Sequence, residues 1–215
     1  MQGFNDTRGT LFFEYARVLQ ECNPKAFIFE NVRNLMNHDK GKTFQIIQNT
    51  FKELGYKIFI KVLNASDYGI PQTRRRIFVV GFRDDIESFE FPEPIPLTKT
   101  VQDLLEEDVD EKYFLNEGFI NNYVLAKEDR WNRKPEVNKP IASTLTTRMG
   151  TLRAEQDNYQ SINGRLRKLT PREGLRLMGY GDDFKMVCSN TQLYKQIGNS
   201  IVVDVIGGVL KKVID

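Results

Sequence analysis

Residues 26–32 read Ala-Phe-Ile-Phe-Glu-Asn-Val, and the rest of the chain is organised around this stretch. A short continuous apolar run is typical of a strand that is buried on both faces of a parallel sheet. Ligands of open α/β sheets bind beyond the carboxyl ends of such strands. Glu30, at the end of the run, is therefore a candidate site residue. The alternative is a carboxylate that caps the following turn.

A second stretch, Gln-Thr-Arg-Arg-Arg at 72–76, precedes another apolar run at 77–82. Side chains alternate along a strand, so Arg74 and Arg76 are expected on one face and Arg75 on the other. Two guanidinium groups on one face suit phosphates or base edges. A solvated basic turn is the plainer alternative.

A third stretch, Gln-Ile-Gly-Asn-Ser at 196–200, precedes an apolar C-terminal segment. Asn199 and Ser200 are expected to open the last helix, where capping is their ordinary role.

Hydrophobic periodicity predicts an α/β arrangement in the first third of the chain. Helices are expected over 10–21 and 42–54, and strands over 26–30, 56–63 and 77–82. The second and third strands are joined by about a dozen residues without a helical pattern, which favours an antiparallel pair. Further on, Thr170, Pro171 and Glu173 are spaced as a capped helix start.

These motifs have a recognisable order: Glu-Asn-Val at 30–32, the arginine stretch, Leu-Thr-Pro-Arg-Glu at 169–173, and Gln-Ile-Gly-Asn-Ser. In this order they resemble the C-terminal portion of the DNA (cytosine-5)-methyltransferases, and they are most similar to small bacterial modification enzymes of the HhaI type. The resemblance covers 1–85 and 164–205 well and the interval between them loosely.

The resemblance implies a partial class I methyltransferase sheet, which is Rossmann-like, with a small, mostly β target-recognition domain. The third strand is then expected to lie antiparallel between the other two. Residues 1–85 would be the C-terminal half of the catalytic domain, and 86–163 the target-recognition domain. Residues 164–215 would return to the catalytic domain with the C-terminal helices.

The resemblance also implies the function and the site residues. Members of the family transfer a methyl group from S-adenosylmethionine to C5 of a cytosine flipped out of duplex DNA, and the bacterial ones serve restriction-modification. Glu30 and Arg76 would hold the cytosine, and Arg74 would steady Arg76 or meet a phosphate. Asn199 and Ser200 would contact the amino-acid end of S-adenosylmethionine.

Candidate DNA contacts lie in the loosely matched interval, where basic and aromatic residues are mixed. The resemblance adds Thr146 and Thr147, since the family often carries a threonine pair there that contacts the target region. An ordinary surface location is an equally good explanation for each of them. They are Arg133, Lys134, Thr146, Thr147, Arg148 and Arg153.

Two motifs of the family do not occur in these 215 residues. There is no Pro-Cys pair for the nucleophile and no glycine-rich first turn, and neither Cys22 nor Cys188 has the nucleophile's context. Strand 26–30 would also be a bare sheet edge. The expectation is a chain that is inactive alone and needs a complementary chain, or that pairs with itself through this edge. A non-catalytic DNA-binding remnant of a disrupted gene and an RNA-directed relative are the alternatives.

Composition sets broader limits. The net charge of +2 conceals twelve acidic and two basic residues at 84–117, against twelve basic and six acidic residues at 127–176. The basic interval is the expected contact for a polyanion. No apolar run reaches the roughly 18 residues that a membrane span needs. The two cysteines have no metal-ligand spacing, and a reduced, cytoplasmic setting is expected.

Overall fold

The computed structural model describes residues 7–84, 86–121, 136–151 and 158–215, with side chains from residue 11 onward. These residues divide into two compact units. The sheet unit comprises Met1–Leu63, Arg75–Pro92 and Val209–Asp215, and the loop unit comprises Asn64–Arg74 and Glu93–Gly208. The boundaries of these units differ from the expected domain boundaries at 85 and 163. In particular, Asn64–Arg74, which precedes the third strand, belongs to the loop unit.

The sheet unit contains three strands, in the order β1-β3-β2. Its helices and strands follow the predicted ones closely, and they are α1 (Thr7–Cys22), β1 (Ala26–Val32), a 3-10 segment (Arg33–Gly41), α2 (Lys42–Glu53), β2 (Lys57–Asn64) and β3 (Arg75–Phe82). Strand β3 lies between the other two and runs antiparallel to β1, as the resemblance implied. Strand β3 thus hydrogen-bonds to both β1 and β2 and joins the three strands into one sheet.

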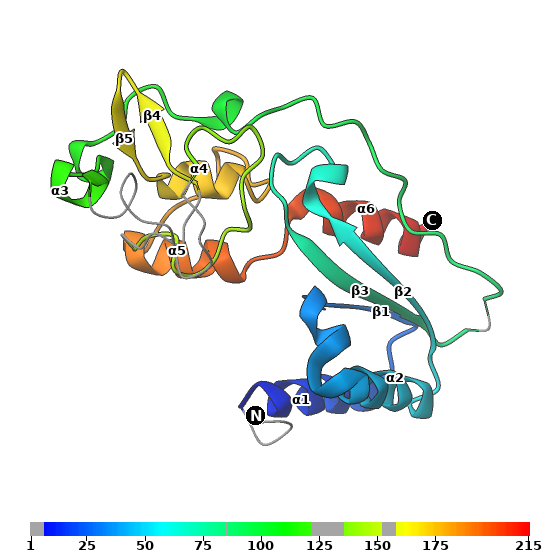
Figure 1. Ribbon diagram of the computed structural model, residues 1–215. Coiled ribbons are helices and arrows are strands. Elements are labelled where there is room, and N and C mark those ends of the chain that lie inside the picture. The colour runs from blue at the N-terminus through cyan, green and yellow to red at the C-terminus, as the bar shows by residue number, and fades with distance from the viewer. Residues whose placement is uncertain (1–6, 85, 122–135, 152–157) are drawn as a thin grey trace. The chain divides into compact units, whose positions relative to one another are not determined.

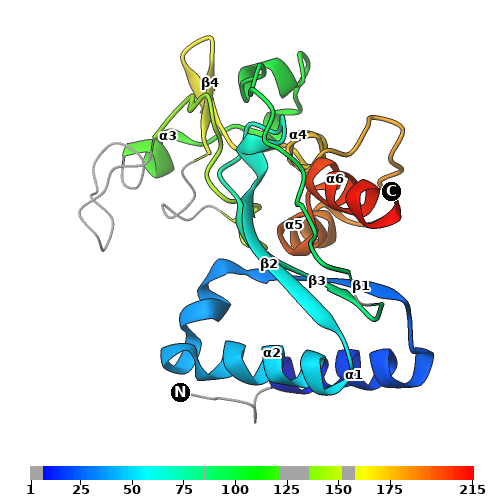
Figure 2. The same cartoon turned by 90° about the vertical axis from the view of Figure 1, so that its right-hand side faces the viewer.

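Helices α1 and α2 lie side by side along one face of this sheet (Figure 2). The residues at 27 and 29 on β1 and at 77 and 79 on β3 point to this face, in line with the antiparallel register. The core there is dominated by aromatic rings at Phe12, Phe27, Phe29, Phe44, Phe51 and Tyr56. Since residues on a strand alternate, Glu30 and Arg76 belong to the opposite face.

The loop unit has little regular secondary structure (Figure 1). Its elements are short, and they are 3-10 turns at Ala65–Asp67, Gln102–Leu104 and Glu111–Tyr113, α3 (Glu117–Phe119), the antiparallel pair β4 (Gln160–Ile162) and β5 (Arg165–Arg167), α4 (Pro171–Arg176), α5 (Asn190–Asn199) and the start of α6 (Val203–Ile214). Helix α4 begins with the predicted capping box of Thr170 and Glu173. Helices α4 and α5 pack against each other.

The expected start of the last helix is wrong. Gly198 and Asn199 end α5, Ser200 is its C-cap with extended backbone, and α6 begins only at Val203. The apolar periodicity continues across the break between the two helices. Asn and Ser do not mark the break, because they suit the end of one helix and the linker to the next as well as a helix start. Asn199 is therefore the last residue of α5, and Ser200 begins the linker to α6.

Candidate active site

Glu30 and Arg76 form an ion pair on the sheet face opposite α1 and α2. In the register Glu30 lies opposite Phe78 and Val32 lies opposite Arg76, so the two charged side chains are diagonal neighbours across the strands. Arg76 Nε lies 3.2 Å from Glu30 Oε1, and the side chains are 16% and 24% exposed, respectively. The structure thus brings together the two residues that the sequence placed at the base site.

The surroundings leave this pair partly hidden from water. Burial is the main cause that lowers the pKa of Arg76 from its usual range, and the charge of Glu30 acts in the opposite direction. Arg76 Nη1 also donates to the carbonyl oxygen of Arg75 at 2.9 Å. A carboxyl group beside a guanidinium offers both acceptors and donors to one planar polar ligand.

Arg74 lies in a different environment from the one expected. Strand β3 begins at Arg75, so the alternation of the strand does not extend to Arg74. Arg74 is 3% exposed, and its guanidinium donates to main-chain oxygens in the loop unit. Nη1 lies 2.9 Å from the oxygen of Leu145, and Nη2 lies 3.0 and 2.7 Å from those of Gly198 and Ser200.

Gln72 has a structural role that was not expected from the sequence. It is fully buried, its Nε2 donates to the oxygen of Leu177 at 2.7 Å, and its Oε1 accepts from the N–H of Leu145 at 3.1 Å. Its position two residues before Arg74 was the available signal. Gln72 and Arg74 therefore bind both main-chain groups of Leu145, its N–H and its carbonyl oxygen.

The stretch 198–200, here called the cofactor turn, joins α5 to the linker before α6. Ser200 Oγ lies 2.7 Å from the hydroxyl of Tyr180, a contact that no sequence pattern had indicated. Asn199 is exposed. Its amide carries a donor and an acceptor, and a hydroxyl lies beside it, which fits the carboxylate and ammonium of an amino-acid group.

Residues 145–148, here called the recognition turn, contain three of the candidate DNA contacts. Thr146, Thr147 and Arg148 are exposed. The N–H of Arg148 donates to Thr146 Oγ1 at 3.2 Å, which helps to close the turn. Two hydroxyls and a guanidinium at the surface can donate hydrogen bonds to phosphates and base edges. The other three candidates, Arg133, Lys134 and Arg153, lie outside the described residues.

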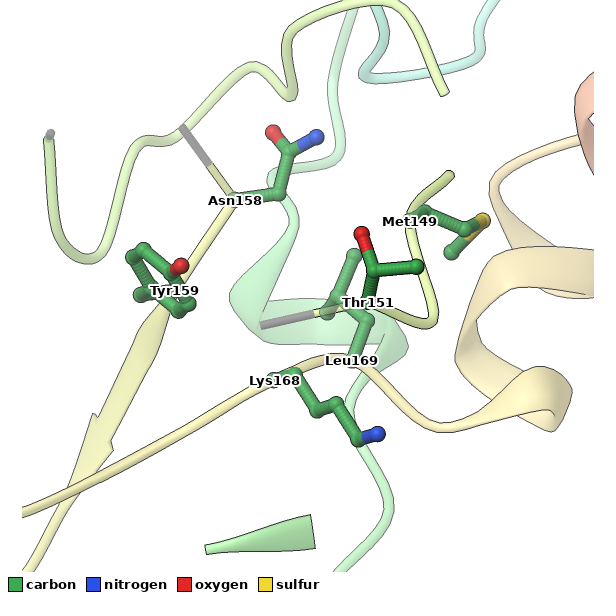
Figure 3. A pocket seen from close by; sticks show the side chains of 6 residues that line it. All are labelled: Met149, Thr151, Asn158, Tyr159, Lys168 and Leu169. Carbon is green, nitrogen blue, oxygen red and sulfur yellow. The ribbon is translucent and has the colours of Figure 1, made fainter. Parts of the chain in front are cut away.

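The hollows of the loop unit are poor substrate sites. One, shown in Figure 3, is lined by Met149, Thr151, Asn158, Tyr159, Lys168 and Leu169 and has a volume of about 10 Å³. That is room for about one water molecule. Another, of about 210 Å³, carries the carboxylates of Glu106, Asp108 and Asp110, which would repel a phosphate backbone.

Metal clusters and membrane-spanning helices are both absent from the described residues. No group of three His, Cys, Asp or Glu side chains in that part of the chain could hold a metal ion. Helices of the length and apolarity required for a membrane span are also missing from it.

Comparisons with known proteins agree on one family. The profile described as C-5 cytosine-specific DNA methylase matches residues 1–215. The chain is 42% identical to the Type II methyltransferase M.SsoII of Shigella sonnei, covering 99% of this chain and 59% of that protein. It is 39% identical to M.HhaI of Haemophilus parahaemolyticus, covering 95% of this chain and 68% of that protein.

Solved structures support the fold at lower identity. The Entamoeba histolytica methyltransferase EhMeth superposes with a TM-score of 0.80 at 18% identity, over 99% of this chain and 70% of that one. The S. pombe Dnmt2 methyltransferase superposes with a TM-score of 0.73 at 20% identity, over 94% of this chain and 70% of that one. In each comparison the chain spans only part of the related protein's length.

Proposed function

Because the chain belongs to the C-5 cytosine-specific DNA methylase family, we propose that it is part of a restriction-modification enzyme that methylates cytosine C5 in duplex DNA. The observation that carries the proposal is the half-buried Glu30–Arg76 pair on the sheet face opposite α1 and α2, near the carboxyl end of β1. The named relatives are Type II methyltransferases, which supports the same substrate class.

Glu30 and Arg76 then hold the flipped base. Nucleophilic attack at C6 places negative charge on the ring, largely at N3 and O2. Glu30 donates a proton or hydrogen bond at N3 and accepts from the exocyclic amine, while the guanidinium of Arg76 faces O2. In the free chain the two side chains form an ion pair, so Glu30 must take up a proton from solvent on base binding before it can donate at N3.

The cofactor turn contributes to the binding of S-adenosylmethionine, which supplies the methyl group. Asn199 offers an exposed amide and Ser200 a hydroxyl that is already oriented by Tyr180. Both would bind the amino-acid end of the cofactor. The turn is a small part of a complete pocket, so the isolated chain should bind the cofactor weakly.

DNA contacts come from the recognition turn through Thr146, Thr147 and Arg148, together with Arg133, Lys134 and Arg153. In functional terms we keep the division into catalytic residues 1–85, a target-recognition domain at 86–163 and a catalytic return at 164–215. The basic character of 127–176 supports this assignment, since phosphate contacts supply much of the affinity for DNA.

The thiolate nucleophile and the glycine-rich first turn come from residues outside this sequence, either on a complementary chain or on a longer form of this one. Among the described strands β1 has β3 as its one neighbour, so its other edge is open to a further strand. A complementary segment that adds a strand there would cover an apolar edge. Self-association through the same edge is the competing outcome.

Reconstitution tests this proposal. The purified chain is mixed with a polypeptide that carries the Pro-Cys loop and the glycine-rich turn, and transfer of labelled methyl to duplex DNA is measured. We expect transfer by the pair and none by the chain alone. Glu30→Gln should lower the single-turnover rate by about 10²–10³ while changing DNA affinity little, since it removes one electrostatic donor.

Arg75→Ala is the control, because Arg75 is exposed and lies on the opposite face of β3 from Arg76. Equal loss of rate in Arg75→Ala and Glu30→Gln would contradict the assignment of the base site. DNA binding without methyl transfer by any pair would favour a non-catalytic remnant. Transfer to tRNA in place of DNA would favour an RNA-directed relative.

A further inference from the structure

The cofactor turn and the recognition turn meet main chain to main chain. A Cβ atom at position 198 would overlap backbone atoms of Thr146 and Thr147, so only glycine allows the approach that the structure has. Backbone contact of this kind leaves no side chain between the segments to absorb a shift. A movement of one turn must therefore displace the other.

Arg74 bridges the same junction. Its Nη1 donates to Leu145 at the start of the recognition turn, and its Nη2 donates to Gly198 and Ser200 of the cofactor turn. The side chain is 3% exposed, so water competes poorly for these carbonyl oxygens. Hydrogen bonds from a charged donor are also stronger than neutral ones.

We propose that Arg74 is a positioning residue, which fixes the cofactor turn and the recognition turn against each other. The proposal rests on the proposed function, since that function gives the two turns their ligands. Arg74 itself contacts neither S-adenosylmethionine nor DNA. It acts through the backbone of Leu145, Gly198 and Ser200, and so links the binding of S-adenosylmethionine to the contact with DNA.

The geometry requires a planar fork. Two nitrogens of one guanidinium reach the two turns at the same time, with fixed angles between them. A lysine ammonium is a single point on a flexible stem, and it could satisfy one turn but not both. Arg74→Lys therefore separates the bridging role from the mere need for a buried cation.

Hydrogen exchange of the 215-residue chain tests the bridge without any ligand. In Arg74→Ala we expect amide exchange about tenfold faster or more in both turns, as expected for the loss of charged hydrogen bonds, with α1, α2 and the sheet unchanged. In Arg74→Lys one turn should stay protected while the other exchanges faster. Gly198→Ala should loosen both turns while Arg74 is intact, because it pushes the backbones apart.

Arg172→Ala is the matched control. Arg172 also donates to two main-chain oxygens of the loop unit, those of Gly181 at 3.3 Å and Phe184 at 3.0 Å. Its removal should affect exchange around 181–184 and leave both turns as they are. Equal acceleration throughout the loop unit in Arg74→Ala, no change in either turn, or full protection of both turns in Arg74→Lys would overturn the proposal.

Kinetics of the reconstituted pair give the second measurement. Arg74→Ala should raise the KM for S-adenosylmethionine and for DNA about tenfold each, with a smaller effect on kcat, whereas Glu30→Gln should act on kcat. An unchanged KM for either substrate would count against Arg74 as a positioning residue. A wild-type pair that transfers no methyl group contradicts the proposed function alone, because the exchange experiment does not depend on it.

Discussion

The interior of the sheet unit is built largely from aromatic rings, whereas the interior of the loop unit combines apolar side chains with buried polar ones. In the sheet unit the ring of Phe27 packs against those of Phe51, tilted, and Tyr56, edge to face, with ring centroids 4.5 and 5.0 Å apart. All buried polar or charged side chains among the described residues fall in the loop unit, and they are Gln72, Arg74, Gln160, Arg167, Thr170 and Glu173.

The difference follows from the backbone. A sheet and two helices satisfy their own N–H and C=O groups, so side chains between them can be wholly apolar. Loops leave main-chain groups unpaired, and buried loops need side chains to satisfy them. Gln72, Arg74 and Glu173 each bind backbone groups of distant segments. In the loop unit polar side chains thus satisfy main-chain groups that hydrogen bonds between strands satisfy in the sheet.

Breaking the Arg167–Glu173 pair is the largest effect expected from this contrast. The pair is fully buried and bidentate, with contacts of 2.8 and 2.6 Å, and Glu173 also accepts from the N–H of Thr170 and Glu106. Glu173→Ala should lower the free energy of unfolding by about 3–5 kcal/mol, because it leaves a buried guanidinium unpaired. Chemical denaturation measures the change.

The double variant Arg167→Met/Glu173→Leu sharpens the result. It removes both charges, so a smaller loss than that of Glu173→Ala alone is expected. A double variant that is as unstable as the single one would mean that the backbone contacts of Glu173 carry the stability, more than the pairing of charges.

Gly81→Ala should have the next largest effect, and it acts on the sheet unit. A Cβ at position 81 would overlap the ring of Phe27, which is itself packed against Phe51 and Tyr56. Overpacking of this kind costs about 1–3 kcal/mol. Gly207→Ala is the control, since no atom lies within 4 Å of its added Cβ and alanine favours a helix. Equal thermal midpoints for the two variants would contradict the close packing at Phe27.

The smallest effect is a pH dependence at the alkaline end. Burial is the main cause that raises the pKa of Tyr15 to about 12, and its hydroxyl donates to the oxygen of Ile28 at 3.1 Å. Because the folded pKa exceeds the usual value of about 10, this stabilisation is complete below pH about 10 and is lost as the pH rises to about 12. Tyr15→Phe should flatten the fall in stability over this range.

Tyr194 offers the same test in the loop unit. Burial raises its pKa as well, and its hydroxyl donates to the oxygen of Leu169 at 2.7 Å. Tyr194→Phe should also reduce the alkaline loss of stability, as measured by urea unfolding at pH 9 and pH 11. An unaltered pH profile in both variants would mean that other groups cause the alkaline transition.

The contrast between the units also explains what the sequence could predict. The hydrophobic periodicity of the sequence predicts the strands and helices of the sheet unit, and β1, β3 and α2 lie where they were expected. The joint placement of Glu30 and Arg76 was implied by the family resemblance, and the register of β1 and β3, which the residues alone did not predict, makes them diagonal neighbours. Arg74, one residue outside β3, has no such periodicity to fix its direction.

The loop unit was less predictable for the same reason. Its structure depends on single hydrogen bonds between segments far apart in the chain, such as Gln72 with Leu177 and Arg74 with Ser200. No local pattern encodes these partners. The break between α5 and α6 was missed because the residues at 199 and 200 suit a helix end as well as a helix start. The capping box at Thr170 was found because its signal is local.

The grip of Arg74 on main-chain oxygens has a consequence for the redesign of sequence specificity. Leu145, Gly198 and Ser200 present carbonyl groups to the guanidinium, and every residue type carries a carbonyl group. The exposed side chains at 147 and 148 can thus be exchanged, or the loop that follows them replaced, without touching the anchor. Under the proposed function, a library at 147 and 148 would vary the DNA contacts while the main-chain bonds to Arg74 are kept, whereas substitution of Gly198 would push the two backbones apart.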